Sequence, residues 1–388
     1  MNIFWRIVSQ ITIWHIAASM CFYAIYAGTP LFRDAFDLTG VTVGWLIAAM
    51  TLGYAVFQLP IGVLTDRFGE HLMLTGGLVG LAVFLLIAVF APTYPVLLVV
   101  LFVMGSMYGT AVPGTNKAIF DNIISGQQHR AIGIKSIGSP IGSATSAILV
   151  TSFAGVLVWY FGFLLVIGIG LAVAGLFYVT YSGASRATAT PPDFRVLLSN
   201  PPLIVLLMFG VCIGSAYYTS VGFTVLYVNE SLGASVAIGG VILALLQIAS
   251  STGKITVGYL ADILPGRTEI TISRILIAQT ILCAVLFFLI GFTSTPLTAG
   301  LVFGLLGLTA LGTTGLYYSL ISMLVSDSEI GSASAAGSLA TTSSGLFAPP
   351  IFGYLVDTTA YSTAWGFLGV LLLIACLLGI FVMVWSNE

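Results

Sequence analysis

The chain alternates between long apolar runs and short polar breaks over its whole length. A helix needs about 20 apolar residues to cross the hydrocarbon core of a bilayer. Six runs of that size precede the longest polar stretch, at roughly 5–27, 41–64, 72–91, 96–119, 131–153 and 156–181. Six more follow it, at roughly 201–228, 235–260, 270–292, 297–325, 331–355 and 362–385. The pattern predicts an all-α membrane protein with twelve transmembrane helices.

The polar stretch between the two sets holds charges and a proline pair, and no apolar run includes it. We expect an N-terminal six-helix bundle at 1–181, a cytoplasmic linker at 182–200 and a C-terminal six-helix bundle at 201–388. The even number of spans places both termini on one side. Cytoplasmic loops carry an excess of Lys and Arg, and here the N-terminus and the loops on its side carry Arg6, Arg67, Arg130, Arg186, Arg195, Arg267 and Arg274, against Arg33 opposite. Both termini are therefore expected in the cytoplasm, with the chain spanning the cytoplasmic membrane several times.

Two loops at matching places in the two halves share a glycine-framed acidic pattern. The second run ends in Gly62-Val-Leu-Thr-Asp66-Arg67-Phe-Gly69, and the eighth ends in a stretch from Gly258 to Arg267 that contains Asp262. Glycine permits a tight turn, and the charged side chains can bind helix ends. The recurrence indicates an internal duplication of six helices, giving two pseudo-symmetric bundles.

With this loop, its twelve runs and its central linker, the chain resembles prokaryotic members of the major facilitator superfamily (MFS) over its full length. Organic-anion or monocarboxylate carriers and nitrate- or cyanate-type carriers are the subfamilies considered. The resemblance implies that the loop is a conformational latch that stabilises the outward-facing state, formed by Gly62, Asp66, Arg67 and Gly69 and, in the second half, by Asp262 and Arg267. The chain departs from the family pattern after Gly69, where Glu70 and His71 replace two basic residues.

Composition agrees with a lipid environment. Hydrophobic residues make up 59% of the chain and charged residues only 6%, against about a quarter charged in soluble domains. The net charge of −2 gives no reason to expect nucleic-acid binding. No nucleotide loop, nucleophile set or metal-ligand pattern is visible, so we expect no enzyme activity, no cofactor and no metal site.

Three lysines interrupt the apolar runs, whereas the acidic residues fall in loops or at the ends of runs. An ion near the bilayer centre costs about 2.5–3.5 kcal/mol on insertion scales. Lys117 stands close to Asp121, and we expect it to extend to the membrane boundary. Lys135 and Lys254 lie deeper, in runs 5 and 8, which the resemblance places across one passage. They suggest a binding path for an anion, although a purely structural role for Lys254 is an equal alternative.

Polar aromatic and amide side chains supply the remaining candidate substrate contacts. Tyrosine hydroxyls form hydrogen bonds without carrying charge. The proposed substrate-binding set is Tyr23, Tyr26, Lys135, Tyr217, Tyr218, Gln247 and Lys254. His15 lies well inside the first run and can titrate near neutral pH, so it is the candidate for proton coupling.

Three functions remain open. The first is a secondary transporter, working as a symporter or antiporter by alternating access on a small organic or inorganic anion, with a proton or sodium as coupling ion. The second is an exporter of hydrophobic or cationic compounds. The third is a sensor or scaffold that transports nothing. We expect a monomer whose partners are its small-molecule substrate and the lipid bilayer.

Overall fold

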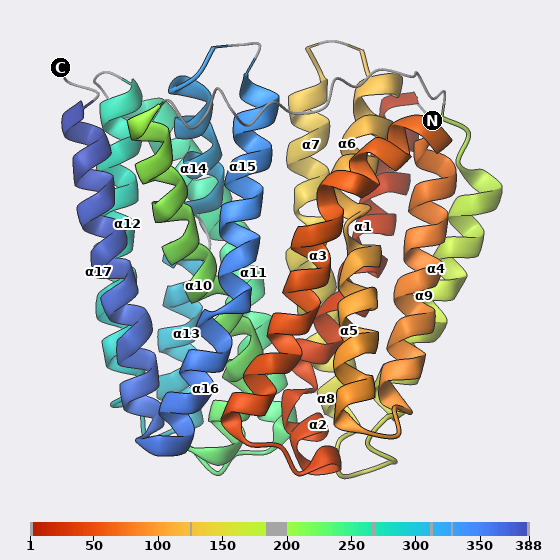
Figure 1. The fold of residues 1–388 in the computed structure, drawn as a ribbon, viewed down its shortest axis with the longest axis vertical. Coiled ribbons are helices and arrows are strands. Elements are labelled where there is room, and N and C mark those ends of the chain that lie inside the picture. The colour runs from red at the N-terminus through yellow and green to blue at the C-terminus, as the bar shows by residue number, and fades with distance from the viewer. Residues whose placement is uncertain are drawn as a thin grey trace. The chain divides into compact units, whose positions relative to one another are not determined.

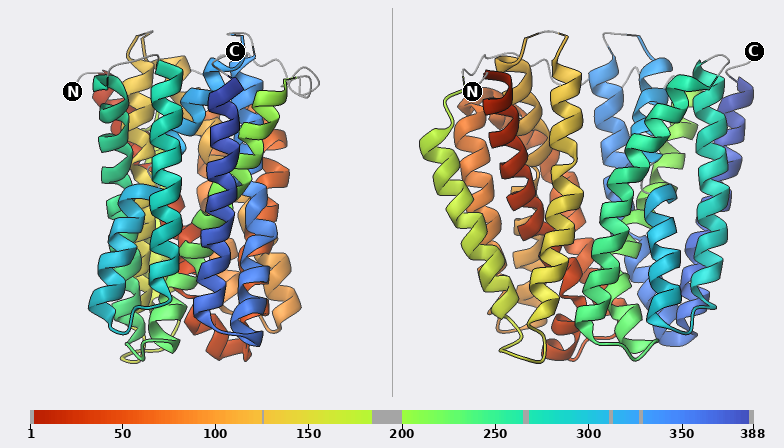
Figure 2. Two further views of the ribbon diagram at one scale, coloured as in Figure 1. Left: turned by 90° about the vertical axis from the view of Figure 1, so that its left-hand side faces the viewer. Right: turned by 180° about the vertical axis from the view of Figure 1, so that it is seen from behind.

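The computed structural model describes residues 3–124, 126–183, 200–264, 268–310, 313–326 and 329–385. Within these ranges, ten helices are long and apolar enough to cross a membrane. They coincide with ten of the twelve expected spans, one of which, Tyr94–Asn122, consists of the two helices α5 and α6. The remaining two expected spans, at 131–153 and 331–355, are also divided into consecutive helices. Figure 1 and Figure 2 show the helical architecture.

The chain divides into two compact units. The first comprises 1–37, 49–191 and 235–244, and the second 38–48, 192–234 and 245–388. Two long helices thus contribute to both: α3 (Gly40–Phe68) begins in the second unit, and α11 (Val236–Ile263) begins in the first. The expected bundle boundaries at 181 and 201 stay a prediction, because residues 184–199 of the linker lie outside the described ranges.

The other helices of the first unit are α1 (Ile3–Ala27), α2 (Thr29–Phe36), α4 (Glu70–Val89), α5 (Tyr94–Tyr108), α6 (Ala111–Asn122), α7 (Gln128–Ser136), α8 (Gly138–Ser152) and α9 (Phe161–Thr180). Helix α1 packs against α8 and α9, and α4 packs against α5 and α9. The indole of Trp14 is fully buried and donates its N–H to the Leu74 carbonyl at 2.9 Å, which ties α1 to α4. At Gly142, an added Cβ would lie 2.3 Å from the Ile16 carbonyl oxygen, so glycine is what lets α8 approach α1.

The other helices of the second unit are α10 (Pro201–Glu230), α12 (Thr268–Ile290), α13 (Pro296–Ala310), α14 (Thr313–Met323), α15 (Ile330–Ser343), the 3₁₀ turn η2 (Ser344–Leu346), α16 (Ala348–Thr358) and α17 (Tyr361–Trp385). Helix α17 packs against α10 and α12, and α10 packs against α15. The core is aromatic, since fully buried Trp365 has ring contacts with Tyr227, Phe287, Phe303 and Phe352.

Proline explains the breaks in the spans at 131–153 and 331–355. Pro140 lies in the first turn of α8 and cannot donate a hydrogen bond to the preceding turn, so the span breaks between α7 and α8. Pro349 and Pro350 do the same in the first turn of α16, after η2. Proline is best tolerated in the first turn of a helix, where the N–H groups have no intrahelical partner.

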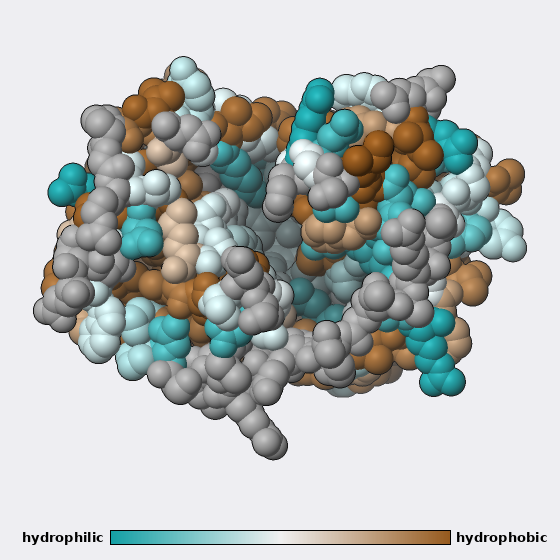
Figure 3. All heavy atoms as spheres, turned by 90° about the horizontal axis from the view of Figure 1, so that it is seen from above, coloured by the Kyte–Doolittle hydropathy of each residue, from teal (hydrophilic) through white to brown (hydrophobic). Residues whose placement is uncertain are grey.

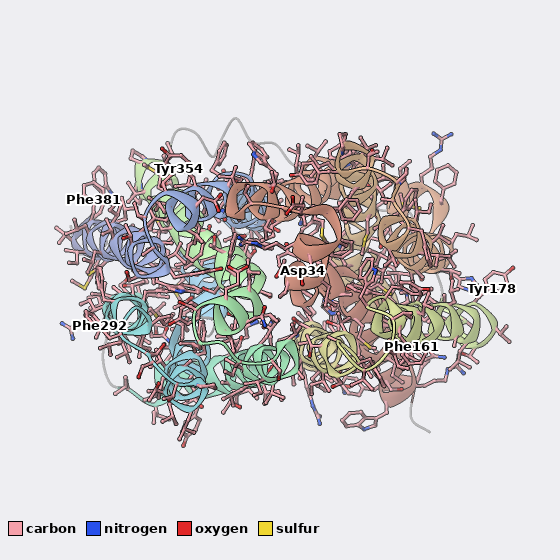
Figure 4. The ribbon with its side chains drawn as sticks, turned by 90° about the horizontal axis from the view of Figure 1, so that it is seen from below. Asp34, Phe161, Tyr178, Phe292, Tyr354 and Phe381 are labelled. Atoms are coloured by element: carbon pink, nitrogen blue, oxygen red, sulfur yellow. The ribbon has the colours of Figure 1, made fainter. Side chains whose placement is uncertain are left out.

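The outer surface of each unit is apolar. Phe292 is 84% exposed, and Tyr178, Tyr354 and Phe381 are also exposed. Figure 4 shows Tyr178 of the first unit and Phe381 of the second pointing away from their helices. Apolar exposure on this scale fits helices surrounded by lipid. Figure 3 looks onto the end at which α4 begins, where hydrophilic residues lie among the hydrophobic ones.

Candidate functional site

Lys135 is a buried cation in the first unit. It lies in the last turn of α7, directly before the break to α8, and is 3% exposed. Its Nζ donates to the Thr115 hydroxyl of α6 at 2.7 Å. Among the described residues no carboxylate lies within ion-pair distance of this ammonium. A buried ammonium without a counter-ion is costly, so an anion that reached this site would be stabilised by it.

His15 lies beside this lysine. It is buried in α1, and its Nδ1 is 3.0 Å from the backbone carbonyl oxygen of Lys135. A carbonyl can only accept, so Nδ1 carries the hydrogen, and Nε2 is the acceptor in the neutral ring. The sequence identified both residues separately, but nothing in it indicated their contact across 120 positions.

The tyrosines of α1 belong to a buried aromatic cluster in the first unit. Tyr23 and Tyr26 are buried, with ring centroids 5.3 Å apart. Tyr108 of α5 stacks on Phe22 at 4.2 Å, and its hydroxyl is 2.9 Å from that of Ser19. Sequence reasoning missed Tyr108, which no spacing rule connects to α1.

The second unit holds the remaining predicted substrate contacts. Tyr218 and Gln247 are buried, and Tyr217 is partly exposed, with its ring edge-on to Tyr218 at 5.1 Å. Lys254 of α11 is half-buried, and no hydrogen bond or ion pair of its ammonium is found within the described ranges. Lys135 belongs to the first unit and Lys254 to the second. The expectation that both lysines face one passage therefore stays a prediction.

The glycine-framed loop of the first unit forms a charge network. Lys117 Nζ lies 3.0 Å from Asp121 Oδ2 and 3.6 Å from Asp66 Oδ1. The expectation that Lys117 extends to the membrane boundary stays a prediction; the side chain is 9% exposed and pairs with two carboxylates near the ends of α3 and α6. Its two ion pairs offset part of the free-energy cost of burying the ammonium.

The structure describes the backbone or the contacts of three other residues of the predicted latch. Gly69 has a φ of 84°, which favours glycine and explains its place between α3 and α4. Gly62 has room for a methyl group. The Arg67 guanidinium lies 5.4 Å from the Phe68 ring. Arg267 and the side chain of Asp262 lie outside the described residues, so the latch stays a prediction.

Sequence reasoning also missed a buried acid. Glu70 follows Gly69 in the first turn of α4 and is 0% exposed. The sequence correctly placed it at the end of a run. Its burial depends on Tyr181, which follows α9 and donates to Glu70 Oε1 at 3.2 Å across 111 positions.

Comparison with known proteins identifies the family. The family model described as Major Facilitator Superfamily matches residues 11–349. The hexuronate transporter of Bacillus subtilis (strain 168) is 24% identical over 87% of this chain and 84% of its own. The probable L-galactonate transporter of Escherichia coli (strain K12) is 24% identical over 84% of this chain and 77% of its own. The 3-(3-hydroxy-phenyl)propionate transporter of the same organism is 26% identical over 81% and 79%.

Solved structures agree on the fold. A bacterial homolog of the human lysosomal transporter Spinster, inward-facing and unoccupied, aligns with a TM-score of 0.83 at 14% identity, covering 99% of this chain and 97% of its own. The nucleoside transporter NupG aligns with a TM-score of 0.83 at 13% identity, covering 97% and 99%. The all-α twelve-span prediction is consistent with this fold, and the expectation of a transporter rather than an enzyme is confirmed. The chain belongs to the Major Facilitator Superfamily of membrane transporters.

Proposed function

We propose that this protein carries a small hydroxylated carboxylate across the cytoplasmic membrane by alternating access. The buried ammonium of Lys135, whose one hydrogen bond in the described ranges goes to Thr115, is the observation that carries the proposal. A substrate carboxylate there would accept a charge-assisted hydrogen bond, which is about twice as strong as a neutral one. Sugar acids and hydroxylated aromatic acids in the relatives' names support this substrate class.

The other predicted contacts suit the rest of such a substrate. Hydroxyl groups both donate and accept, as do tyrosine hydroxyls and the amide of Gln247. Tyr23, Tyr26, Tyr217 and Tyr218 are the tyrosines assigned to this role, and Lys254 supplies the second cation. His15 can hold Lys135 in place through its hydrogen bond to the lysine carbonyl. The proposal leaves the direction of transport open. It places both termini in the cytoplasm and takes the protein to be a monomer.

Uptake by purified protein in liposomes tests it. The panel contains a hexuronate, L-galactonate, 3-(3-hydroxyphenyl)propionate and the neutral sugar that matches the hexuronate. We expect uptake of at least one acid and none of the neutral sugar. Losing a hydrogen bond to a charged group costs about 1.5–3 kcal/mol, so Lys135→Gln should weaken binding about tenfold to 100-fold.

Matched variants separate the site from general charge effects. Lys135→Arg keeps the charge and should retain part of the uptake. Arg274→Gln removes an exposed cation of the second unit and should transport like the wild type. Unchanged uptake in both Lys135→Gln and Lys254→Gln, or equal transport of the neutral sugar, would contradict the anion assignment.

A further inference from the structure

Glu70 is a buried carboxylate that the proposed substrate site does not use. It begins α4 and is 0% exposed, at the end of the first unit where α3 and α9 end and the N-terminus lies (Figure 1). The family pattern that this loop resembles has a basic residue at this position. This chain has a buried acid there instead, and that acid has no role in the latch as expected from the sequence.

The two oxygens of Glu70 have different surroundings. Oε1 accepts from the Tyr181 hydroxyl at 3.2 Å, and that hydroxyl also lies 3.4 Å from the Asn122 amide nitrogen. Oε2 is buried and has no hydrogen-bond partner within the described ranges. An ionised carboxylate with one oxygen buried and unpaired is expensive, whereas a carboxylic acid at the same place loses its charge and most of that cost.

Tyr181 remains a neutral hydrogen-bond donor. Burial, and then the nearby Glu70 carboxylate, raise the pKa of Tyr181 well above its usual range. Asp121 acts in the same direction. The phenol therefore keeps its proton at physiological pH and holds Glu70 through Oε1 in either protonation state.

Within the described ranges Glu70 has no ion pair with a cationic side chain. Lys117 already pairs with Asp121 and Asp66, and the Arg67 guanidinium lies over Phe68. The groups on the neighbouring α1 and on α4 itself are engaged elsewhere: Arg6 donates to Ser182, and His71 Nε2 lies 3.0 Å from the Tyr178 carbonyl oxygen. Lys117 is thus shared by two acids, Asp66 and Asp121, and Glu70 is not one of its partners within the described ranges.

Two features favour the ionised form. The start of a helix carries a partial positive charge, and Glu70 lies in the first turn of α4. Burial opposes ionisation, while the helix start and the Tyr181 hydroxyl support it.

We propose that Glu70 is a proton-binding site, which holds one proton on Oε2 while Oε1 keeps the Tyr181 hydroxyl. The proton is exchanged with water, and no other bond changes. A metal cation is a poorer fit, because no cluster of three or more acidic, histidine or cysteine side chains suited to a metal is found within the described ranges. The further step, that this proton drives transport, rests on the proposed function.

Infrared difference spectroscopy of the purified protein tests proton binding without any substrate. Between acidic and alkaline buffer, the wild type should show the carbonyl band of a buried carboxylic acid, and Glu70→Gln should lack it. Glu269→Gln is the matched control, because Glu269 is the first-turn acid of α12 in the second unit and is partly exposed. Identical spectra for wild type and Glu70→Gln, or loss of the band in Glu269→Gln alone, would overturn the proposal.

A second variant keeps the test decisive if Glu70→Gln does not fold. Tyr181→Phe leaves the acid in place and removes the hydrogen bond to Oε1. The band should persist and move to higher frequency, because a carbonyl without a hydrogen bond vibrates faster. A band that does not move means that it comes from another acid.

Transport tests the coupling separately. In liposomes with an imposed pH gradient, Glu70→Gln should lose uphill accumulation of the anion but keep counterflow, which needs no proton. Loss of accumulation in His15→Asn but not in Glu70→Gln would move the coupling site to His15. If the wild type carries no organic anion, the proposed function fails while the infrared result still decides proton binding.

Discussion

The carboxylate of Asp357 holds the start of α3 in the second unit through Gly40. Its Oδ1 accepts from the Gly40 backbone N–H at 2.7 Å, and its Oδ2 accepts from Val41 at 2.9 Å. The first N–H groups of a helix have no partner within the helix, and here a side chain 317 positions away supplies one. The negative charge also meets the positive end of the helix dipole.

Removing this cap should destabilise the protein. Loss of a helix cap costs about 0.5–2 kcal/mol, so Asp357→Ala should lower the midpoint of thermal unfolding in detergent. Asp357→Asn keeps one oxygen acceptor and should have a smaller effect. Equal midpoints for the wild type and Asp357→Ala would show that water replaces the carboxylate at no cost.

The same contact depends on glycine at position 353. A Cβ there would lie 2.0 Å from the Gly40 carbonyl oxygen, which is backbone and cannot move aside. We expect Gly353→Ala to separate α16 from α3 and to lower the unfolding midpoint. Gly315→Ala is the control, because nothing lies within 4 Å of its added Cβ. That change should be neutral or stabilise α14 by up to about 1 kcal/mol.

The two acids that pair with Lys117 should differ in importance. Removing one partner of a buried ion pair costs about 3–5 kcal/mol, and Asp121 at 3.0 Å is closer than Asp66 at 3.6 Å. Asp121→Asn should therefore destabilise the protein more than Asp66→Asn, as measured by thermal unfolding. Lys117→Gln with Asp121→Asn should recover part of the loss. The reverse order of the single variants would show that Asp66 is the main partner.

The start of α15 should depend on pH. Hydrogen bonds from the Ser326 hydroxyl and then its backbone N–H hold the pKa of Glu329 below its usual value. Because the folded pKa is depressed, this stabilisation is complete above the unfolded pKa and is lost as pH falls through the folded pKa. Hydrogen exchange in the first turn of α15 should accelerate on acidification in the wild type. Glu329→Gln should exchange faster at neutral pH, without that pH dependence.

Much of the fold followed from the sequence. Apolar runs of about bilayer length located the spans, because each helix in lipid satisfies its own backbone and leaves a local signature. The two glycine-framed loops predicted an internal duplication. Sequence reasoning missed the interruptions at Pro140 and Pro349, where the run remains apolar although the helix does not continue.

The sequence by itself determined that this is a membrane protein with many membrane-spanning helices. It also located lysines within the apolar runs, where burying a charge costs free energy. Only the tertiary structure decided which groups meet: Lys135 with Thr115, Glu70 with Tyr181, and Asp357 with Gly40. These partners are 20, 111 and 317 positions apart. The spacing of apolar residues along the sequence indicates only which face of a helix is apolar. Contacts between distant residues depend on how separate helices pack.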